Sequence, residues 1–111
     1  MYDNFDMPMN GIEWESKKAQ SNFEKHKVSF ETAQYVFSDP ERLERIDRSK
    51  ENSSKEERFQ TLGMVNKILF VVYAERGKNK RIISARLADK TERRSYNGYY
   101  QIDSKGWSKA L

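Results

Sequence analysis

The 111-residue sequence predicts an α+β fold, with two helices near its start, a small sheet and one more helix after the last strand. Two observations support this fold class. Residues 68–75 and 80–87 are apolar runs on either side of a short turn that contains Gly77, as in a β-hairpin. Residues 16–27 and 30–38 instead carry their apolar side chains at helical spacing.

The composition indicates one domain, residues 1–111, with a charged surface and a modest core, because charged residues make up 34% and hydrophobic residues 36% of the chain. The absence of cysteine and the single histidine exclude a disulfide framework and thiolate or multi-histidine metal sites. We see no acidic cluster suited to Mg²⁺ and expect no cofactor. With no membrane-length apolar run and no signal peptide, we expect a cytoplasmic protein without a membrane partner.

Positive charge is concentrated in the second half of the chain. Residues 67–111 contain eleven Lys and Arg against four Asp and Glu, whereas residues 1–66 contain ten against thirteen. This basic half favours an anionic partner such as RNA, although ordinary solvated surface charge explains it as well.

The N-terminal elements follow from local signals. Residues 1–10 are predicted to be a flexible lead-in, and the alternation in residues 12–15 predicts an edge strand. Ser16 is predicted to cap the first helix and Ser29 the second. Asp39-Pro40 is expected to end the second helix, since proline disfavours helical geometry in the residue before it.

The first part of the sheet is predicted from alternation and apolar content. Weak alternation in residues 42–47 predicts a short exposed strand, and the polar residues 48–57 predict a loop. Residues 58–63 are predicted to begin the sheet proper, with residues 65–67 as a connection. Residues 68–75 are apolar on both faces, which indicates a central strand.

The strand predicted over residues 80–87 carries the side chains of greatest interest. A regular pleat places alternate residues on opposite faces. One predicted face carries Ile83, Ala85 and Leu87, and the other carries Ile82, Ser84 and Arg86.

The last helix has clear end signals. Asp89 and Glu92 have the spacing of a capping box, and Gly98 is expected to stop the helix at about Asn97. The tail, residues 99–111, has aromatic side chains but no clear period.

Ser84 and Arg86 are the most suggestive pair. A hydroxyl and a guanidinium on one strand face can hold a phosphate together. A solvated arginine at a strand edge is the alternative. No His or Asp lies near Ser84 in the sequence, so nothing suggests a nucleophilic serine.

Other basic residues extend this candidate site. His26 is the default proton-transfer group because its ordinary pKa is near neutrality, although a histidine at a helix C-terminus also stabilises the helix dipole. Arg58 and Arg86 come together if their strands flank residues 68–75. A basic surface along the sheet is predicted from Arg58, Arg76, Lys78, Lys80 and Arg81, and the first helix adds Lys18 and Lys25.

These residues suit cleavage of RNA without a metal ion. RNA supplies its own nucleophile, the 2′-OH, so the protein needs to provide positioning, charge stabilisation and modest acid–base help. The same basic groove also suits passive RNA binding.

Three blocks together resemble the BrnT family of toxins from bacterial type II toxin–antitoxin systems, from Ile12 to about Tyr96. They are IEWESKKAQSNFEKHKVSFETAQYVFSDP, ERFQTLG and ILFVVYAERGKNKRIISARLADKTERRSY. The resemblance implies a RelE-like fold, with a curved antiparallel sheet, two N-terminal helices packed on it and a helix after the last strand. Lys27 departs from the family's usual glycine, and Phe59 from its usual tryptophan.

The resemblance also implies a function and a site. It implies a ribonuclease that inhibits translation and is neutralised by a BrnA-type antitoxin, whose DNA-binding domain lets the pair bind operator DNA. By motif position it implies site residues Lys18, Lys25, His26, Arg58, Ser84 and Arg86. We take His26, Arg58, Ser84 and Arg86 as candidate catalytic residues and Lys18, Lys25, Arg76 and Arg81 as candidate RNA-binding residues. The alternatives are a non-catalytic RNA- or ribosome-binding module and a domain that only binds its partner.

Overall fold

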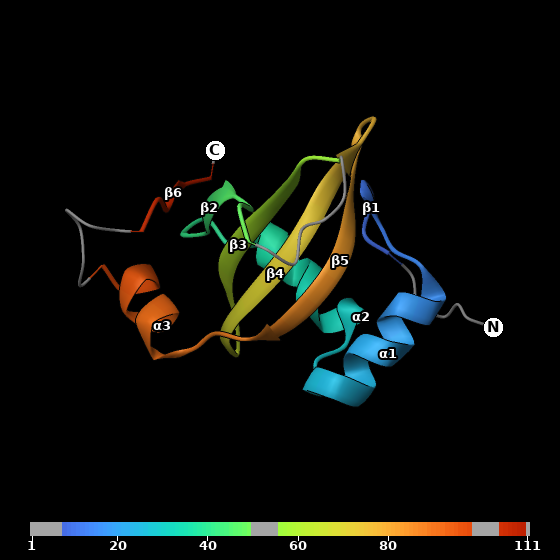
Figure 1. Cartoon of the computed structure of the whole chain (residues 1–111), viewed down its shortest axis with the longest axis horizontal. Helices are drawn as coiled ribbons and strands as arrows, with labels where there is room; N and C mark the ends of the chain where they lie inside the picture. Colours follow the sequence, from blue (N-terminus) through green and yellow to red (C-terminus); the bar gives the residue numbers. More distant parts are fainter. Residues whose placement is uncertain (1–7, 50–55, 99–104, 111) are drawn as a thin grey trace.

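The computed structural model describes residues 8–49, 56–98 and 105–110, and within them a six-stranded sheet of order β1-β5-β4-β3-β2-β6 forms the centre (Figure 1). The strands are β1 (Ile12–Glu13), β2 (Leu43–Ile46), β3 (Arg58–Val65), β4 (Lys67–Arg76), β5 (Asn79–Leu87) and β6 (Ser108–Lys109). The helices are α1 (Ser16–His26), α2 (Phe30–Ala33), the 3-10 helix η1 (Gln34–Ser38) and α3 (Lys90–Tyr96).

The α+β class is confirmed, and the sheet is mixed. Strands β2 to β5 pair antiparallel along the order of the sheet, whereas β1 pairs in parallel with β5. The expected antiparallel sheet is found except at this edge, where β1 is parallel because the chain enters α1 directly after β1 and never makes a hairpin with β5. The predictions for residues 1–7, 50–55, 99–104 and 111 lie outside the described residues.

Strands β3 and β4 are longer than predicted. Only Asn66 separates them, at φ 64°, where the sequence predicted a three-residue connection. Asparagine tolerates this left-handed conformation better than most residues, which makes the tight turn possible.

Helices α1, α2 and η1 cover one face of the sheet, called here the helical face (Figure 1). Val36 of η1 packs so closely on β3 that a side chain at Gly63 has no space. The buried residues of this face are Ile12, Val28, Phe30, Ala33, Val36, Leu69, Val71, Ile82 and Ala85.

The opposite face is called here the α3 face. Its core contains Leu62, Ile68, Phe70, Ala88 and Trp107, with Tyr96 of α3 packed against it. Because β4 contributes buried side chains to both cores, the prediction of a central strand covered on both sides is confirmed. Trp107 comes from the tail, where the sequence showed no period, and β6 after it pairs with β2.

Strand β5 contains an irregularity that changes its predicted faces. Val72 pairs with Ser84 and Tyr73 with Ile82, so Ile83 is an extra residue, as in a β-bulge. Ile82 therefore lies on the helical face with Ala85, and both are fully buried. The predicted grouping of Ile82 with Ser84 is wrong, whereas Ser84 and Arg86 still share the α3 face.

Helix α1 begins differently from the prediction, and its last turn explains the conformation of Lys27. Glu15 occupies the cap position without a side-chain hydrogen bond, so Ser16 begins the helix rather than capping it. Lys27 ends the helix at φ 60°, and its N–H donates to the Phe23 carbonyl. Glycine takes this conformation at low cost, which accounts for glycine being usual in the resembled family.

The remaining helix signals are confirmed. The Ser29 side chain accepts a hydrogen bond from the Thr32 N–H at 3.0 Å, and η1 ends directly before Asp39. Asp89 and Glu92 form both hydrogen bonds of the capping box at 2.8 Å.

Candidate functional site

Cross-strand pairing arranges the α3 face in three rows that run from β3 through β4 to β5. The rows are Arg58–Ala74–Arg81, Gln60–Val72–Ser84 and Leu62–Phe70–Arg86. Arg58, Arg81, Ser84 and Arg86 therefore share one face, whereas Lys80 lies on the other face, over the Tyr73 ring. Arg58 and Arg86 do flank β4, but two rows apart, so their backbones are separated by roughly 16 Å.

The first row borders a cavity of about 120 Å³, called here the Arg58 cavity. Its lining brings together four of the predicted residues, although they come from α1 and from three strands. They are Lys18, Arg58, Arg76 and Arg81, with Glu15, Glu56, Ile82 and Ile83 beside them.

The arginines of this cavity differ in their partners. Arg81 donates from Nε to Glu13 at 2.7 Å, and Arg76 donates to Glu56 at 3.2 Å. The Nε of Arg58 is buried and has no hydrogen-bond partner among the residues that the structure describes. A buried donor left unpaired costs free energy. The Arg58 side chain that carries it also lines the cavity, whose basic residues favour a ligand with acceptor oxygens.

Strand β1 brings Glu13 to Arg81, because the parallel register pairs these two residues. Hydrogen bonds from Asn79 and Arg81 hold the pKa of Glu13 below its usual value. Glu13 is therefore ionised at neutral pH and offsets part of the charge of Arg81.

Ser84 lies in the next row and is half-buried. The bulge at Ile83 keeps its side chain on the α3 face, beside the row of Arg58 and Arg81. A phosphate near Arg58 and Arg81 can thus accept a further hydrogen bond from this hydroxyl.

Other side chains of the protein bind the guanidinium of Arg86. Its two terminal nitrogens donate to the two carboxylate oxygens of Glu92, each at 2.9 Å, and its guanidinium lies 3.9 Å from the centre of the Phe70 ring. Glu92 also accepts from the Asp89 N–H. Arg86 therefore ties β5 to the start of α3, a role that sequence spacing alone did not reveal.

His26 lies at the end of α1, in a different pocket of about 350 Å³ that Phe23, Val65 and Leu87 also line. Burial, then the charges of Lys25 and Arg86, lower the pKa of His26 below its usual value. The imidazole is thus neutral at pH 7. The structure places it in the same pocket as Leu87, the residue after Arg86, and not in the Arg58 cavity, and Lys25 before it is exposed.

Asn22 is an important residue that the sequence reasoning did not single out. Its amide donates to the Ala85 carbonyl at 2.9 Å and to the Val28 carbonyl at 3.1 Å, and its oxygen accepts from the Ala85 N–H at 3.1 Å. Asn22 thereby provides hydrogen-bond partners for the Ala85 backbone at the edge of β5, beyond the part that pairs with β1. Its four-residue spacing from Lys18 and His26 was the available signal, because all three lie along one helix strip.

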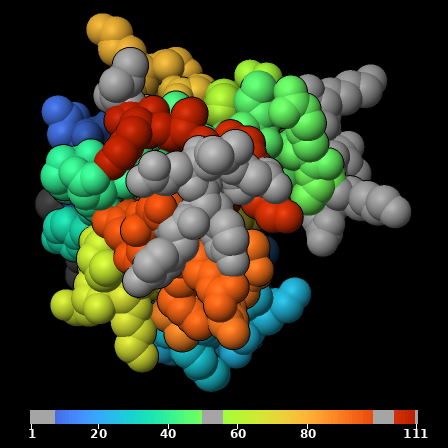
Figure 2. Space-filling view, turned by 90° about the vertical axis from the view of Figure 1, so that its left-hand side faces the viewer, coloured from blue at the N-terminus to red at the C-terminus, as the bar shows by residue number. Residues whose placement is uncertain are grey.

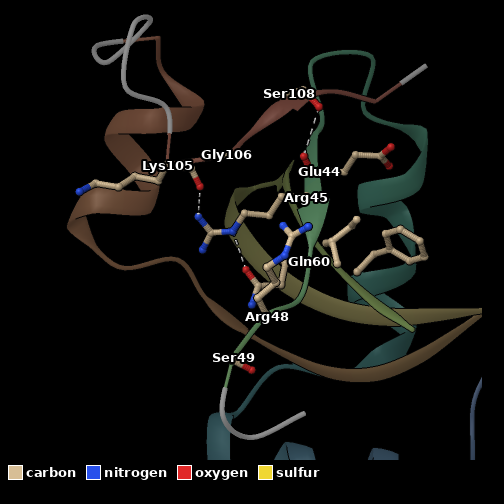
Figure 3. Close-up of a pocket in the computed structure, with 10 residues that line it drawn as sticks. Glu44, Arg45, Arg48, Ser49, Gln60, Lys105, Gly106 and Ser108 are labelled. Atoms are coloured by element: carbon tan, nitrogen blue, oxygen red, sulfur yellow. Dashed lines mark hydrogen bonds between the residues drawn. The ribbon is translucent and has the colours of Figure 1, made fainter. Parts of the chain in front are cut away.

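A larger pocket of about 560 Å³ lies beside the second row (Figure 3). Arg45 donates to the Gln60 side chain at 2.7 Å and to the Lys105 carbonyl at 2.6 Å, with its guanidinium 4.0 Å from the Trp107 ring centre. Burial lowers the pKa of Arg45. Arg48 and Lys105 also line this pocket together with Glu44, so basic side chains gather at a second place on the described chain.

This arrangement suits a polyanion bound along the α3 face. Within residues 8–49, 56–98 and 105–110, no group of three or more His, Asp or Glu side chains gathers to hold a metal ion. No helix in that part of the chain is long and apolar enough to cross a membrane.

Comparisons with known proteins agree with the fold. A family described as "Ribonuclease toxin, BrnT, of type II toxin-antitoxin system" matches residues 14–92. The crystal structure of the Brucella abortus ribonuclease toxin BrnT matches with a TM-score of 0.51 and 24% identity, over 71% of this chain and 96% of that one. At this identity the likeness shows a shared fold. A search of curated proteins found no match.

Proposed function

Because the chain belongs to the BrnT family of ribonuclease toxins of type II toxin–antitoxin systems, we propose that it is a metal-independent endoribonuclease of the cytoplasm. In this proposal it inhibits translation and is neutralised by a BrnA-type antitoxin whose DNA-binding domain carries the complex to operator DNA. The observation that supports the RNA site most is the buried, unpartnered Nε of Arg58 in a cavity lined by further basic residues.

In the proposed site a phosphate of RNA lies between Arg58 and Arg81. Arg58 donates from its fork to the phosphate oxygens, and Ser84 adds a hydrogen bond from the next row. The 2′-OH of the preceding ribose gives its proton to solvent and attacks phosphorus to form a 2′,3′-cyclic phosphate, while the P–O5′ bond breaks and O5′ takes up a proton. The guanidinium groups stabilise the charge that builds up on the phosphate oxygens in the transition state.

For proton transfer, the geometry favours Lys18 over His26. Lys18 lines the Arg58 cavity, so its ammonium group can donate a proton to the departing O5′. His26 lines a separate pocket at the other end of β5. Arg86, bound to Glu92, acts as a positioning residue that fixes the strand carrying Ser84.

Cleavage of RNA by the purified protein in the presence of EDTA tests this proposal. We expect unchanged cleavage with chelator and products that end in a 2′,3′-cyclic phosphate and a 5′-hydroxyl, because the 2′-OH is the nucleophile. Loss of cleavage with EDTA, restored by Mg²⁺, contradicts the metal-independent mechanism.

The second candidate is a non-catalytic RNA- or ribosome-binding module, which the basic lining of the pocket around Arg45 and Arg48 favours. Such a module binds RNA with an affinity that falls steeply with salt and cleaves it under no condition. Binding of RNA without cleavage, with or without ribosomes, supports this candidate over the ribonuclease.

A further inference from the structure

We propose that a surface around the β3–β4 hairpin is the docking site for an acidic, amphipathic segment of the antitoxin. This hairpin surface has Phe23, Met64, Asn66 and Leu87 at its centre and Lys27, Lys67 and Arg93 at its rim. The inference rests on the proposed antitoxin partner and not on the proposed cleavage mechanism.

The centre of the hairpin surface is apolar and exposed. Leu87 is 48% exposed, Phe23 49% and Met64 43%, which makes three of the five exposed large hydrophobic side chains in the described part of the chain. They border two adjoining pockets of about 350 and 400 Å³, which share Asn66, Lys67 and Leu87. Figure 2 shows the yellow-green hairpin beside the orange α3, with the cyan end of α1 next to them. Such clustering of apolar side chains on a surface marks an interaction site.

The rim of this surface is cationic. Lys27, Lys67 and Arg93 line the two pockets, and neither pocket has an Asp or Glu in its lining. The Arg58 cavity is different, because Glu15 and Glu56 line it together with its basic residues. A partner that satisfies the hairpin surface therefore needs apolar side chains at its centre and carboxylates at its edges.

A protein segment fits this chemistry better than RNA does. Aliphatic Leu87 and Met64 gain free energy when they are covered by apolar side chains, but they offer no aromatic ring on which a base can stack. Phe23 already has the Lys27 ammonium 5.9 Å from its ring centre. An amphipathic helix or strand presents apolar and acidic side chains together, which is the required pattern.

The hairpin surface lies apart from the proposed RNA site. Leu87 is six residues from Arg81 along β5, roughly 18 Å away. Leu87 directly follows Arg86 in β5, and His26 lines the same pocket as Leu87. A docked segment therefore lies against the Arg86 end of β5. Substitutions in the hairpin surface are therefore expected to weaken antitoxin binding without changing the Arg58 cavity.

The test uses the full-length protein and the antitoxin encoded in the same operon, with affinity measured by isothermal titration calorimetry. We expect Leu87→Glu to weaken binding about 100-fold, since hot-spot residues near the centre of an interface have effects of this size. Lys67→Glu is expected to weaken it about 10-fold and to reduce the dependence of affinity on salt. Leu87→Ala, which disturbs the fold less, is expected to weaken it in the same direction.

Matched controls are Tyr35→Glu, an apolar-to-acidic change at a side chain that is 52% exposed on η1, and Lys78→Glu in the turn between β4 and β5. Both are expected to leave the affinity within about twofold of wild type. All variants are compared for RNA cleavage and thermal unfolding, where Leu87→Ala and Lys67→Glu are expected to match wild type.

Three outcomes overturn the inference. Antitoxin affinity that is unchanged in Leu87→Glu and Lys67→Glu removes the hairpin surface from the interface. Weaker RNA affinity in these variants, with unchanged antitoxin affinity, assigns the surface to RNA. A wild-type protein that binds no such antitoxin contradicts the proposed partner itself, whereas binding by a protein that cleaves no RNA contradicts only the ribonuclease.

Discussion

The two ends of β5 carry arginines that look alike in the sequence but stand in different surroundings. At one end, Arg81 donates to Glu13 but shares a cavity with Arg58, whose buried Nε has no partner within the described residues. At the other end, Arg86 donates to both oxygens of Glu92 and lies over Phe70. The first end is arranged for a ligand, and the second is arranged for the fold.

The contrast indicates that a basic residue is a good candidate for ligand binding where the protein leaves its donors unpaired. Arg86 follows Ser84 at strand spacing, which selected it as a phosphate ligand. Its paired hydrogen bonds to Glu92 leave less of its fork for a phosphate. Substitutions in the Arg58 cavity are therefore expected to reduce activity, and substitution of Arg86 is expected to reduce stability.

The largest expected effect is on cleavage by Arg58→Ala. We expect kcat/KM for RNA to fall about 100-fold, or about 2.7 kcal/mol, because a donor aimed at the transition-state charge is lost. Arg58→Lys is expected to recover little of this, since an ammonium lacks the planar fork of arginine. Thermal unfolding is expected to change little in either variant.

The control is Lys78→Ala, which removes an exposed charge that belongs to the predicted basic surface but does not line the Arg58 cavity. It is expected to leave kcat/KM within about twofold of wild type. An equal loss in this variant means that general positive charge, and not the Arg58 cavity, carries the activity.

The next largest effect is on stability. Arg86→Ala is expected to lower the free energy of unfolding by about 2 kcal/mol, because it leaves the carboxylate of Glu92 without its partner in a site where that side chain is only 10% exposed. For a domain of this size the melting temperature falls by about 8 °C. A double-mutant cycle with Glu92→Gln measures the coupling between the two side chains.

One result contradicts the different roles of the two ends of β5. If Arg86→Ala unfolds like wild type but cleaves RNA as poorly as Arg58→Ala, then Arg86 contacts the phosphate. The two ends of β5 then form one site, as the spacing of Ser84 and Arg86 suggested.

The sequence predicted most of the fold because its signals were local. The capping box of Asp89 and Glu92, the Ser29 cap and the apolar run of β4 each depend on neighbours in the chain. The bulge at Ile83 was not predictable, because Ile82 and Ile83 are identical in character and either suits the helical face. Trp107 was missed because an isolated aromatic residue in a tail has no periodic neighbours.

The sequence named the candidate site residues but did not predict which of them lie together. Lys18, Arg58, Arg76 and Arg81 meet in one cavity, whereas His26 and Arg86 lie at the other end of β5. The places of Lys18 and His26 depend on how α1 lies along β5, and the hydrogen bonds of Asn22 to Ala85 hold α1 there. The sequence shows no such contact between residues 63 positions apart.

A smaller effect is expected where α1 ends. Lys27→Gly is expected to raise the free energy of unfolding by about 1 kcal/mol, because glycine adopts the left-handed conformation that Lys27 holds at φ 60° without steric cost. The melting temperature then rises by about 4 °C. Lys105→Gly is a matched control at another left-handed position, φ 59°, far from α1 along the chain. A fall in stability for Lys27→Gly contradicts the interpretation of this cap.

The smallest expected effect is on the titration of His26, the only histidine in the chain, which NMR resolves directly. Burial, then Lys25 and Arg86, lower its pKa below 6.5 in the folded state. The unfolded state therefore binds its proton first, so the stability contribution is present above about pH 6.5 and is lost as the pH falls through the folded pKa.

Arg86→Ala is expected to raise the pKa of His26, because one of the charges that oppose its protonation is removed, whereas Arg58→Ala is expected to leave it unchanged. His26→Gln is expected to flatten the fall in melting temperature between about pH 7 and pH 5, since glutamine does not titrate. Equal shifts of the His26 pKa in the two arginine variants contradict the separation of the two ends of β5. A shift in Arg86→Ala alone shows that His26 shares its surroundings with the structural arginine and not with the proposed RNA site.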